Sequence, residues 1–443
     1  MDGERCCTIL SIAQERSRDG PENLYKWCCY AIVASALLPS LIIFCFLQAD
    51  APLPSVVQEM RLSPYYPLRF SLDGQRGVDL YHTFIFAEAW SDGFSPYGPI
   101  PDRYFQNYQW DRTPVHPPFT YFVYRMLVPL GFPAVRTIHT IAKLALFFLS
   151  AAAVLWSLRA EKVLLPTLLA ILCCIFLSPT GLSELERGQS ELFIAASFML
   201  VFAAVFRDRA LWLILAGIAA SLKISSLLFL GPFVFLAFAV NRERFGRMIF
   251  VIAVVFFSLL LFFPFLSGFA RSILVGDLLV GGADGNQYAD GVSFALLFPY
   301  YIGKSIIIAS TMFFLGIFLS IRGREQRTES FLRASFPLAV MLILQAIGFR
   351  TLSWEYKSVE ILALLPGLYL WLREAHVSLW YQRVVASSYG VLLMVVSHLF
   401  PFKSGILFAE YADMARVYFI ASCLFSFLAL VGILSGRTRA AKV

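Results

Sequence analysis

Carboxylate and histidine side chains lie among many aromatic residues in one stretch of this chain, residues 49–136. Aromatic walls can receive a lipid, and acid or base groups between them can act on what the lipid carries. Anchoring at a bilayer surface explains the aromatic residues but not the carboxylates and histidines. The stretch therefore predicts a polar pocket at a membrane surface.

Asp79 is the carboxylate of this stretch with the most defined setting. Residues 77–90 predict a helix that ends at Asp92 and Gly93, with Asp79 at its start and His82 and Thr83 on the same face one turn on. In one interpretation Asp79 caps the helix by accepting backbone N–H bonds, which is worth about 1 kcal/mol. In the other it accepts a proton from a substrate hydroxyl. The residues alone favour the cap.

Membrane helices must position these side chains. Of the 443 residues, 59% are hydrophobic and 15% charged, against about 25% charged in an average soluble domain. The mean hydropathy is +0.71, and the apolar residues form blocks of about 17 to 25, long enough to cross a hydrocarbon core as helix. This excludes soluble enzymes, nucleic-acid binders and fibrous proteins. The net charge of +7 comes from short basic clusters that orient the chain in the bilayer.

The pattern predicts an all-α polytopic membrane protein with about twelve transmembrane helices. They are placed at 27–47, 137–158, 163–180, 191–206, 210–222, 224–240, 248–266, 294–321, 331–348, 358–372, 384–400 and 414–434. Six basic clusters then share the cytoplasmic side with both termini, as the loop-charge bias requires. Residues 117–131 begin with two prolines and carry Arg125, so they are expected to form a helix lying in the interface.

Three regions follow from this topology: a cytoplasmic segment 1–26, a membrane domain 27–435 and a basic tail 436–443, with loop 49–136 outside. The eight cysteines fall in the amino terminus or inside spans, so structural disulfides are not expected. Palmitoylation of Cys28 and Cys29 is an alternative to core packing. The first 25 residues do not resemble a cleaved signal. Because N-glycosylation sequons are absent, a bacterial plasma membrane is favoured over the endoplasmic reticulum.

Four motifs in order give the chain a family resemblance. They are Asp79-x-Tyr81 through Gly93-x-x-Pro96-Tyr97-Gly98 and His116-Pro117-Pro118; Gly188-Gln189-Ser190-Glu191 with Gly217-x-x-Ala220-Ser221-Leu222-Lys223; Gly285-Asn286-Gln287; and Leu352-Ser353-Trp354-Glu355-Tyr356-Lys357. Together they resemble the GT-C membrane glycosyltransferases, and among these glycosyltransferase family 87, the polyprenol-phosphate-mannose-dependent mannosyltransferases. The resemblance covers residues 77 to about 370. All four motifs fall on the external side of a topology drawn from charge alone.

The resemblance implies a GT-C-like bundle that moves a sugar from a polyprenyl-phosphate donor to a hydroxyl of a glycan or glycolipid acceptor. Mannose is the sugar that the resemblance favours. Asp79 would be the general base of an inverting reaction, and cations would stabilise the leaving phosphate. The cation candidates are Lys223, Arg350, Lys357 and Arg187, and the other substrate-binding candidates are His82, Tyr97, His116, Gln189, Asn286 and Trp354. No cofactor or metal-ligand motif is expected, although external aspartates could hold a divalent ion.

Departures from the family pattern and simpler interpretations stay open. Glu191 replaces the usual asparagine, while Ile224 and Leu352 replace prolines, and these departures bear on the substrate more than on the reaction. Lys223 could snorkel at the interface, and Arg350 and Lys357 could pair with nearby carboxylates. Residues 184–191 could form a solvated turn in which Gln189 alone matters. A transporter or lipid flippase is the rival function, and a scaffold without catalysis is the third.

Overall fold

The computed structural model describes an all-helical protein, as predicted. It describes residues 20–37, 77–106, 114, 116–178, 181, 184–185, 187–206, 210–223, 253–255, 257–258, 260–280, 324–349, 355–374, 377–396 and 411–434, and these contain no strand. After an amino-terminal helix at 20–37, the main helices are α4 Val78–Ser91, α5 Pro118–Leu127, α6 Phe132–Ser157, α7 Glu161–Phe176, α9 Glu191–Phe206, α10 Ala210–Ser221, α13 Phe263–Val280, α15 Arg324–Phe349, α16 Leu365–Glu374, α17 Leu379–Val396 and α18 Tyr411–Leu434. The 3-10 helices are η1 Asp102–Phe105, η2 Val128–Leu130 and η4 Glu355–Leu364.

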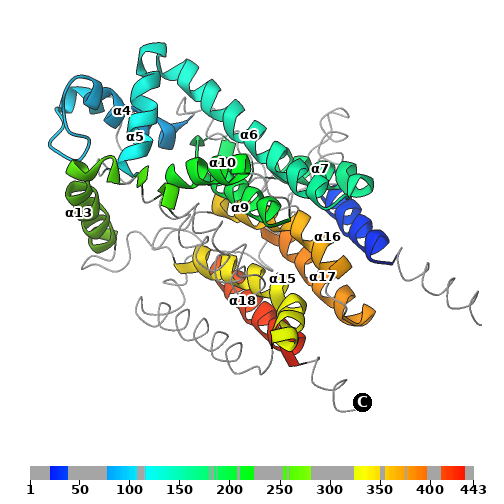
Figure 1. The fold of residues 1–443 in the computed structure, drawn as a ribbon. Helices are drawn as coiled ribbons and strands as arrows, with labels where there is room; N and C mark the ends of the chain where they lie inside the picture. Colours follow the sequence, from blue (N-terminus) through cyan, green and yellow to red (C-terminus); the bar gives the residue numbers. More distant parts are fainter. Residues whose placement is uncertain are drawn as a thin grey trace, which may run out of the picture.

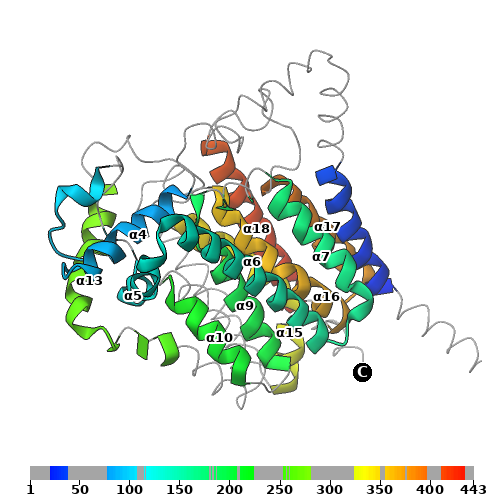
Figure 2. The same cartoon turned by 90° about the horizontal axis from the view of Figure 1, so that it is seen from above.

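The helices form a bundle with a smaller helical group at one end. In Figures 1 and 2, α4, α5 and α13 gather at one end, while α7, α17 and the amino-terminal helix lie at the other. α6 links the two ends and packs on α9, and α15 packs on α18. The end with α4 and α5 holds most of the residues that the sequence singled out.

α9 lies at the centre of the bundle because it is apolar on all sides. Its described side chains are buried, and it contacts α6, α10 and η4. A helix without a polar face must be enclosed by other helices or by lipid. α9 thereby fixes the place of Glu191, its first residue, inside the protein.

The predicted helices agree with the structure in most places. α9 has the predicted bounds, and α6, α7, α10, α17 and α18 begin and end within a few residues of the expected positions. The end predicted at 266 is wrong, because a helix begins at Phe263 and runs to Val280. The helix predicted at 358–372 is divided into η4 and α16, and α15 starts earlier than expected, at Arg324. The predicted helices at 224–240 and 294–321 lie outside the described residues.

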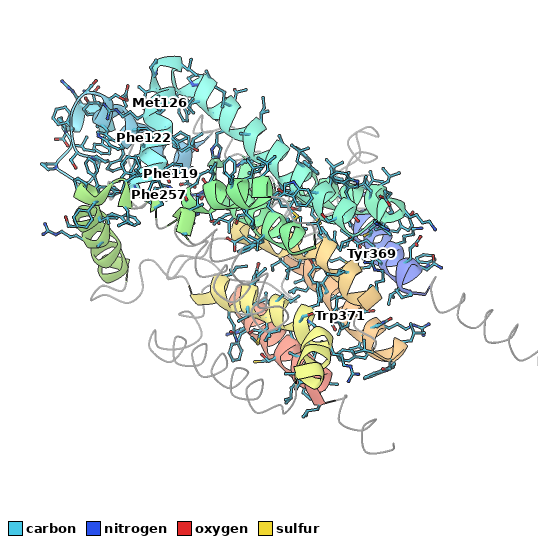
Figure 3. The ribbon with its side chains drawn as sticks, viewed as in Figure 1. Phe119, Phe122, Met126, Phe257, Tyr369 and Trp371 are labelled. Atoms are coloured by element: carbon cyan, nitrogen blue, oxygen red, sulfur yellow. The ribbon has the colours of Figure 1, made fainter. Side chains whose placement is uncertain are left out.

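Two of the described helices are long and apolar enough to cross a membrane, Phe132–Ser157 and Arg416–Leu434. Membrane association is supported to that extent, and twelve spans stay a prediction. The helix expected at 117–131 is present as α5 followed by η2. Figure 3 shows Phe122 and Met126 on α5, where they are 38% and 67% exposed. This apolar outer face suits a helix that lies at a lipid surface.

Candidate active site

Two glycines in left-handed conformation bring α4 against the turn that precedes α9. Gly77 (φ 80°) is the N-cap of α4, and Gly188 (φ 71°) precedes Gln189. A Cβ atom on Gly188 would lie 2.7 Å from Cβ of Leu80 and 3.5 Å from Cα of Gly77. The turn approaches α4 so closely because Gly188 carries no side chain, whereas a Cβ on Gly77 would meet Arg136 and Phe132 of α6. This approach places the turn next to Asp79.

Asp79 is held by two side chains from that turn. Arg187 donates from Nε to Oδ2 at 2.6 Å and from Nη2 to Oδ1 at 3.2 Å, and the side-chain amide of Gln189 donates to Oδ2. A guanidinium that contacts both carboxylate oxygens forms a stronger ion pair than one that makes a single contact. The Asp79 side chain remains 26% exposed. The capping interpretation is wrong, since Gly77 is the N-cap and α4 has no side-chain cap bond.

Lys223 follows α10 and pairs with Glu191 at the start of α9. Its Nζ lies 2.5 Å from Oε1 of Glu191. The Lys223 side chain is 18% exposed and that of Glu191 is fully buried. A hydrogen bond of 2.6 Å from Oγ1 of Thr120 to the carbonyl of Leu222 fastens α5 to the same place. Glu191, the departure from the family pattern, thus supplies the negative charge that faces Lys223.

α6 contributes two polar residues that the sequence analysis missed, His139 and Lys143. The Lys143 Nζ donates to the carbonyls of Glu184 and Gln189 at 3.0 and 2.8 Å and to Oε1 of Glu184 at 3.3 Å. These three acceptors match the three N–H donors of an ammonium. The signal in the sequence was a histidine and a lysine four positions apart inside an apolar span, where ionisable residues are rare and functional.

His139 links α5 to the same carbonyl. Its Nε2 lies 3.0 Å from the Gln189 carbonyl, and its Nδ1 lies 2.5 Å from the Tyr124 hydroxyl. A carbonyl only accepts, so Nε2 carries the proton and Nδ1 accepts from Tyr124. Tyr124, His139 and Lys143 therefore fix the backbone of Gln189, whose side chain contacts Asp79.

Glu184 is a fully buried carboxylate in a helical stretch between α7 and α9. Burial raises its pKa to about 7, and the nearby Lys143 opposes this rise. Its Oε1 also accepts from the backbone N–H of Leu192 at 3.4 Å. Glu184, Arg187 and Glu191 all make ion pairs, and the two glutamates have no exposed side-chain surface. The prediction of an ordinary solvated turn is therefore wrong for these residues.

Two other predicted residues, Tyr97 and His82, lie near His116. The Tyr97 hydroxyl donates to the carbonyl of His116 at 2.6 Å, and the His116 backbone N–H donates to Tyr121 Oη at 3.2 Å. Burial, together with the charges of Lys223 and His82, lowers the His116 pKa to about 3. The imidazole is therefore neutral, and its buried Nδ1 has no hydrogen-bond partner among the described residues. His82 is buried, with its ring edge-on to Phe86.

The remaining predicted residues are not placed at this site. Lys357 belongs to η4, and its side chain is not described. Asn286, Arg350 and Trp354 lie outside the described residues. The structure thus brings together Asp79, Gln189, Lys223, His82, Tyr97 and His116. Within the described residues, no three His, Cys, Asp or Glu side chains are grouped as metal ligands.

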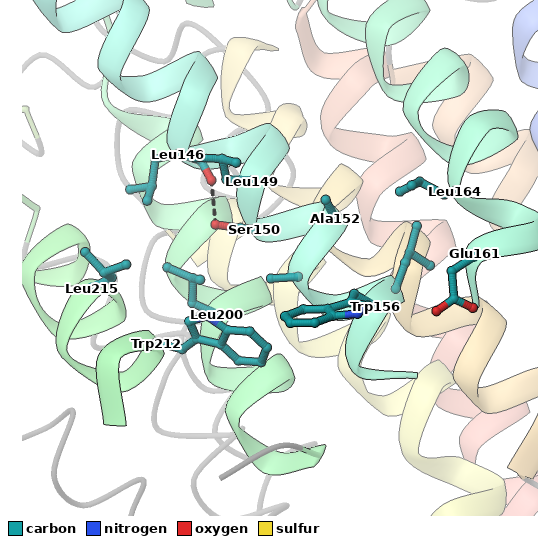
Figure 4. Close-up of a pocket in the computed structure, with 12 residues that line it drawn as sticks. Leu146, Leu149, Ser150, Ala152, Trp156, Glu161, Leu164, Leu200, Trp212 and Leu215 are labelled. Atoms are coloured by element: carbon teal, nitrogen blue, oxygen red, sulfur yellow. Dashed lines mark hydrogen bonds between the residues drawn. The ribbon is translucent and has the colours of Figure 1, made fainter. Parts of the chain in front are cut away.

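An apolar groove begins one turn beyond Lys143 along α6. It has a volume of about 470 Å³, and side chains of α6, α7, α9 and α10 line it, including Leu146, Leu149, Ser150, Trp156, Leu200 and Trp212. Figure 4 shows that the Ser150 hydroxyl is bonded within α6, and its acceptor is the carbonyl of Leu146. The groove therefore offers an almost wholly apolar wall.

No family model, curated protein or solved structure matches this chain. A function for this chain is therefore proposed from the geometry of the site and from the four sequence motifs.

Proposed function

We propose that this chain is an integral membrane glycosyltransferase of the GT-C type. It transfers a sugar from a polyprenyl-phosphate donor to a hydroxyl of a lipid- or glycan-linked acceptor on the external face of a bacterial plasma membrane. Mannose is the first sugar to test. The observation that carries the proposal is Asp79, a partly exposed carboxylate held by Arg187 and Gln189. Two further groups support the proposal: a second cation, Lys223, and a neutral buried imidazole, His116.

Asp79 is suited to take the acceptor's proton. A carboxylate offers about four lone-pair directions, and Arg187 and Gln189 occupy three of them. The fourth and the exposed part of the side chain are available to an acceptor hydroxyl. The hydroxyl proton passes to Asp79 while the oxygen attacks the anomeric carbon. The bond from that carbon to the phosphate oxygen breaks, and polyprenyl phosphate leaves with the electron pair. This single displacement inverts the configuration at the anomeric carbon.

The leaving phosphate gains negative charge, so fixed cations stabilise the transition state. Lys223 is the described cation assigned to this task, with Arg350 and Lys357 as proposed neighbours. The proposed reaction calls for no cofactor, because the lipid-linked sugar is itself the activated substrate. The apolar groove along α6 can receive a lipid tail whose head lies near Lys143. The proposed architecture is the twelve-span bundle 27–435 with the loop 49–136 outside.

A transporter or flippase is the second candidate, and one observation favours it. Lys143 is fully buried in a helix that is long enough to cross a membrane and pairs with the buried Glu184. Buried ion pairs at membrane depth often line substrate pathways. A transporter would move the lipid-linked sugar across a bilayer without cleaving it.

The test incubates purified protein in nanodiscs with a panel of polyprenyl-phosphate sugars and an acceptor mixture, and measures released polyprenyl phosphate. We expect release by the wild-type protein and none by Asp79→Asn, which keeps the shape of the side chain but removes the base. Asp92→Asn, at the other end of α4 and 53% exposed, is the matched control and should retain release. Wild-type-like release by Asp79→Asn would remove Asp79 as the base. Lipid movement in proteoliposomes without any release would favour the transporter.

A further inference from the structure

Each ion pair of the site combines one positive and one negative charge, so the three pairs together carry no net charge. Asp79 pairs with Arg187, Glu191 with Lys223 and Glu184 with Lys143. An anionic ligand that enters this region adds a negative charge that these pairs do not balance. Such a charge is unfavourable where little water can solvate it. Unless the proposed neighbours Arg350 and Lys357 balance this charge, the ligand must break a pair or bring a positive charge with it.

Glu184 can accept that positive charge as a proton. Its Oε1 accepts from Lys143 and from Leu192, while its buried Oε2 has no hydrogen-bond partner in the described part of the chain. A proton on Oε2 therefore breaks no hydrogen bond. Asp79 differs, because both of its oxygens accept hydrogen bonds. Lys143 keeps its two carbonyl acceptors when Glu184 is neutral.

Charged and titratable groups on each neighbouring element act on Glu184. Lys143 and His139 lie on α6, Glu191 begins α9, and Lys223 follows α10. The two lysines favour the ionised carboxylate, whereas burial and Glu191 favour the protonated one. Beyond Gln189 lie Asp79 on α4 and Arg187. An anion beside Lys223 acts as a second Glu191 would, because it also places negative charge near Glu184.

We propose that an anionic ligand binds beside Lys223 together with one proton, which Oε2 of Glu184 takes from solvent. The Glu184 carboxylate becomes a carboxylic acid, the ligand keeps its bonds, and the summed charge of the site stays as it was. The inference rests on the proposed function for its ligand class, a phosphodiester that links a lipid to a sugar. Phosphate binding in this protein is thereby coupled to proton uptake.

The experiment is isothermal titration calorimetry of full-length protein in nanodiscs with citronellyl methyl phosphate. This isoprenoid phosphodiester carries one negative charge throughout the range from about pH 6 to about pH 8.5, so its own titration does not interfere. Titrations in two buffers with different ionisation enthalpies count the protons taken up. With the Glu184 pKa at about 7, we expect about half a proton at pH 7, more near pH 8, and a dissociation constant that rises about fivefold between these pH values.

Two variants locate the proton. Glu184→Gln should bind the probe without proton uptake and without the pH dependence. Glu88→Gln, a matched change at a half-buried glutamate on α4, should behave as the wild type does. The wild-type titration stands even if Glu184→Gln does not fold. Binding without uptake would overturn the inference and leave the proposed donor class intact, as would uptake that persists in Glu184→Gln. If the probe does not bind at any pH, the donor class is wrong and the inference falls with it.

Discussion

Arg187 contacts Asp79 with two donors at once, and this geometry matters more than its charge. A lysine at the same position keeps the charge but has no planar fork to hold both oxygens. Arg187→Lys should therefore lower kcat by about tenfold to a hundredfold, as expected when a reacting group shifts by about 1 Å, and leave KM near the wild-type value. Steady-state kinetics of sugar transfer, with Arg103→Lys at an exposed site as control, measure this. An unchanged kcat would mean that the clamp does not position Asp79.

His116 gives the protein a dependence of stability on pH whose sign follows from its burial. The pKa is about 3 in the folded protein and about 6.5 when the chain unfolds. The unfolded state therefore binds more protons between these values, and stability falls as the pH drops below about 6.5. At pH 5 the contribution reaches up to about 2 kcal/mol.

Replacement of His116 with glutamine removes this titration. The decrease in Tm between pH 7 and pH 5 should be smaller in His116→Gln than in the wild type, measured by thermal unfolding in the same detergent. Equal decreases in both proteins would show that the imidazole is not buried in its neutral form.

At the scale of elements, the contact of α4 with the turn at Gly188 assembles the site. Gly188→Ala introduces a Cβ that clashes with Leu80 at 2.7 Å. Gly93→Ala is the matched control, since Gly93 also has positive φ (93°) but nothing within 4 Å of its Cβ position. Both changes carry a backbone strain of about 1 kcal/mol, and only Gly188→Ala also separates Arg187 from Asp79. We expect Gly188→Ala to lose sugar transfer and to unfold at a lower temperature than Gly93→Ala. Equal effects would mean that α4 and the turn need not touch.

Local sequence patterns predicted the helices but not the tertiary contacts between them. α9 was predicted with its correct bounds because every turn of it is apolar, and α4 because Gly77 and Asp92-Gly93 bracket a continuous run. The role of Arg187 could not be predicted in this way, because its partner lies 108 positions away and the pair depends on the close approach of Gly188 to Leu80 of α4. The end at Val280 was missed because Arg271 and Asp277 interrupt the apolar pattern without ending the helix.

At the scale of the whole molecule, the predicted topology places residues 106 and 326 on opposite sides of the membrane. Gln106 follows η1 and is exposed, and Gln326 is in the first turn of α15. In a background with the eight native cysteines replaced, Gln106→Cys should react with a membrane-impermeant maleimide added outside intact cells. Gln326→Cys should react only after the cells are opened. Equal labelling of the two from outside would overturn the topology.

Lys143 also has a consequence for how the protein is made. It is synthesised 41 residues before Glu184, so in the proposed topology α6 reaches the insertion machinery before the partner of its charge exists. A lone lysine at the centre of a membrane helix disfavours insertion by about 3 kcal/mol, and the apolar residues of α6 must offset this alone. A nascent chain that stops before residue 184 would lack the carboxylate that pairs with Lys143. In the proposed topology, the charge of Lys143 therefore gains its partner only after the segment before α9 has been synthesised.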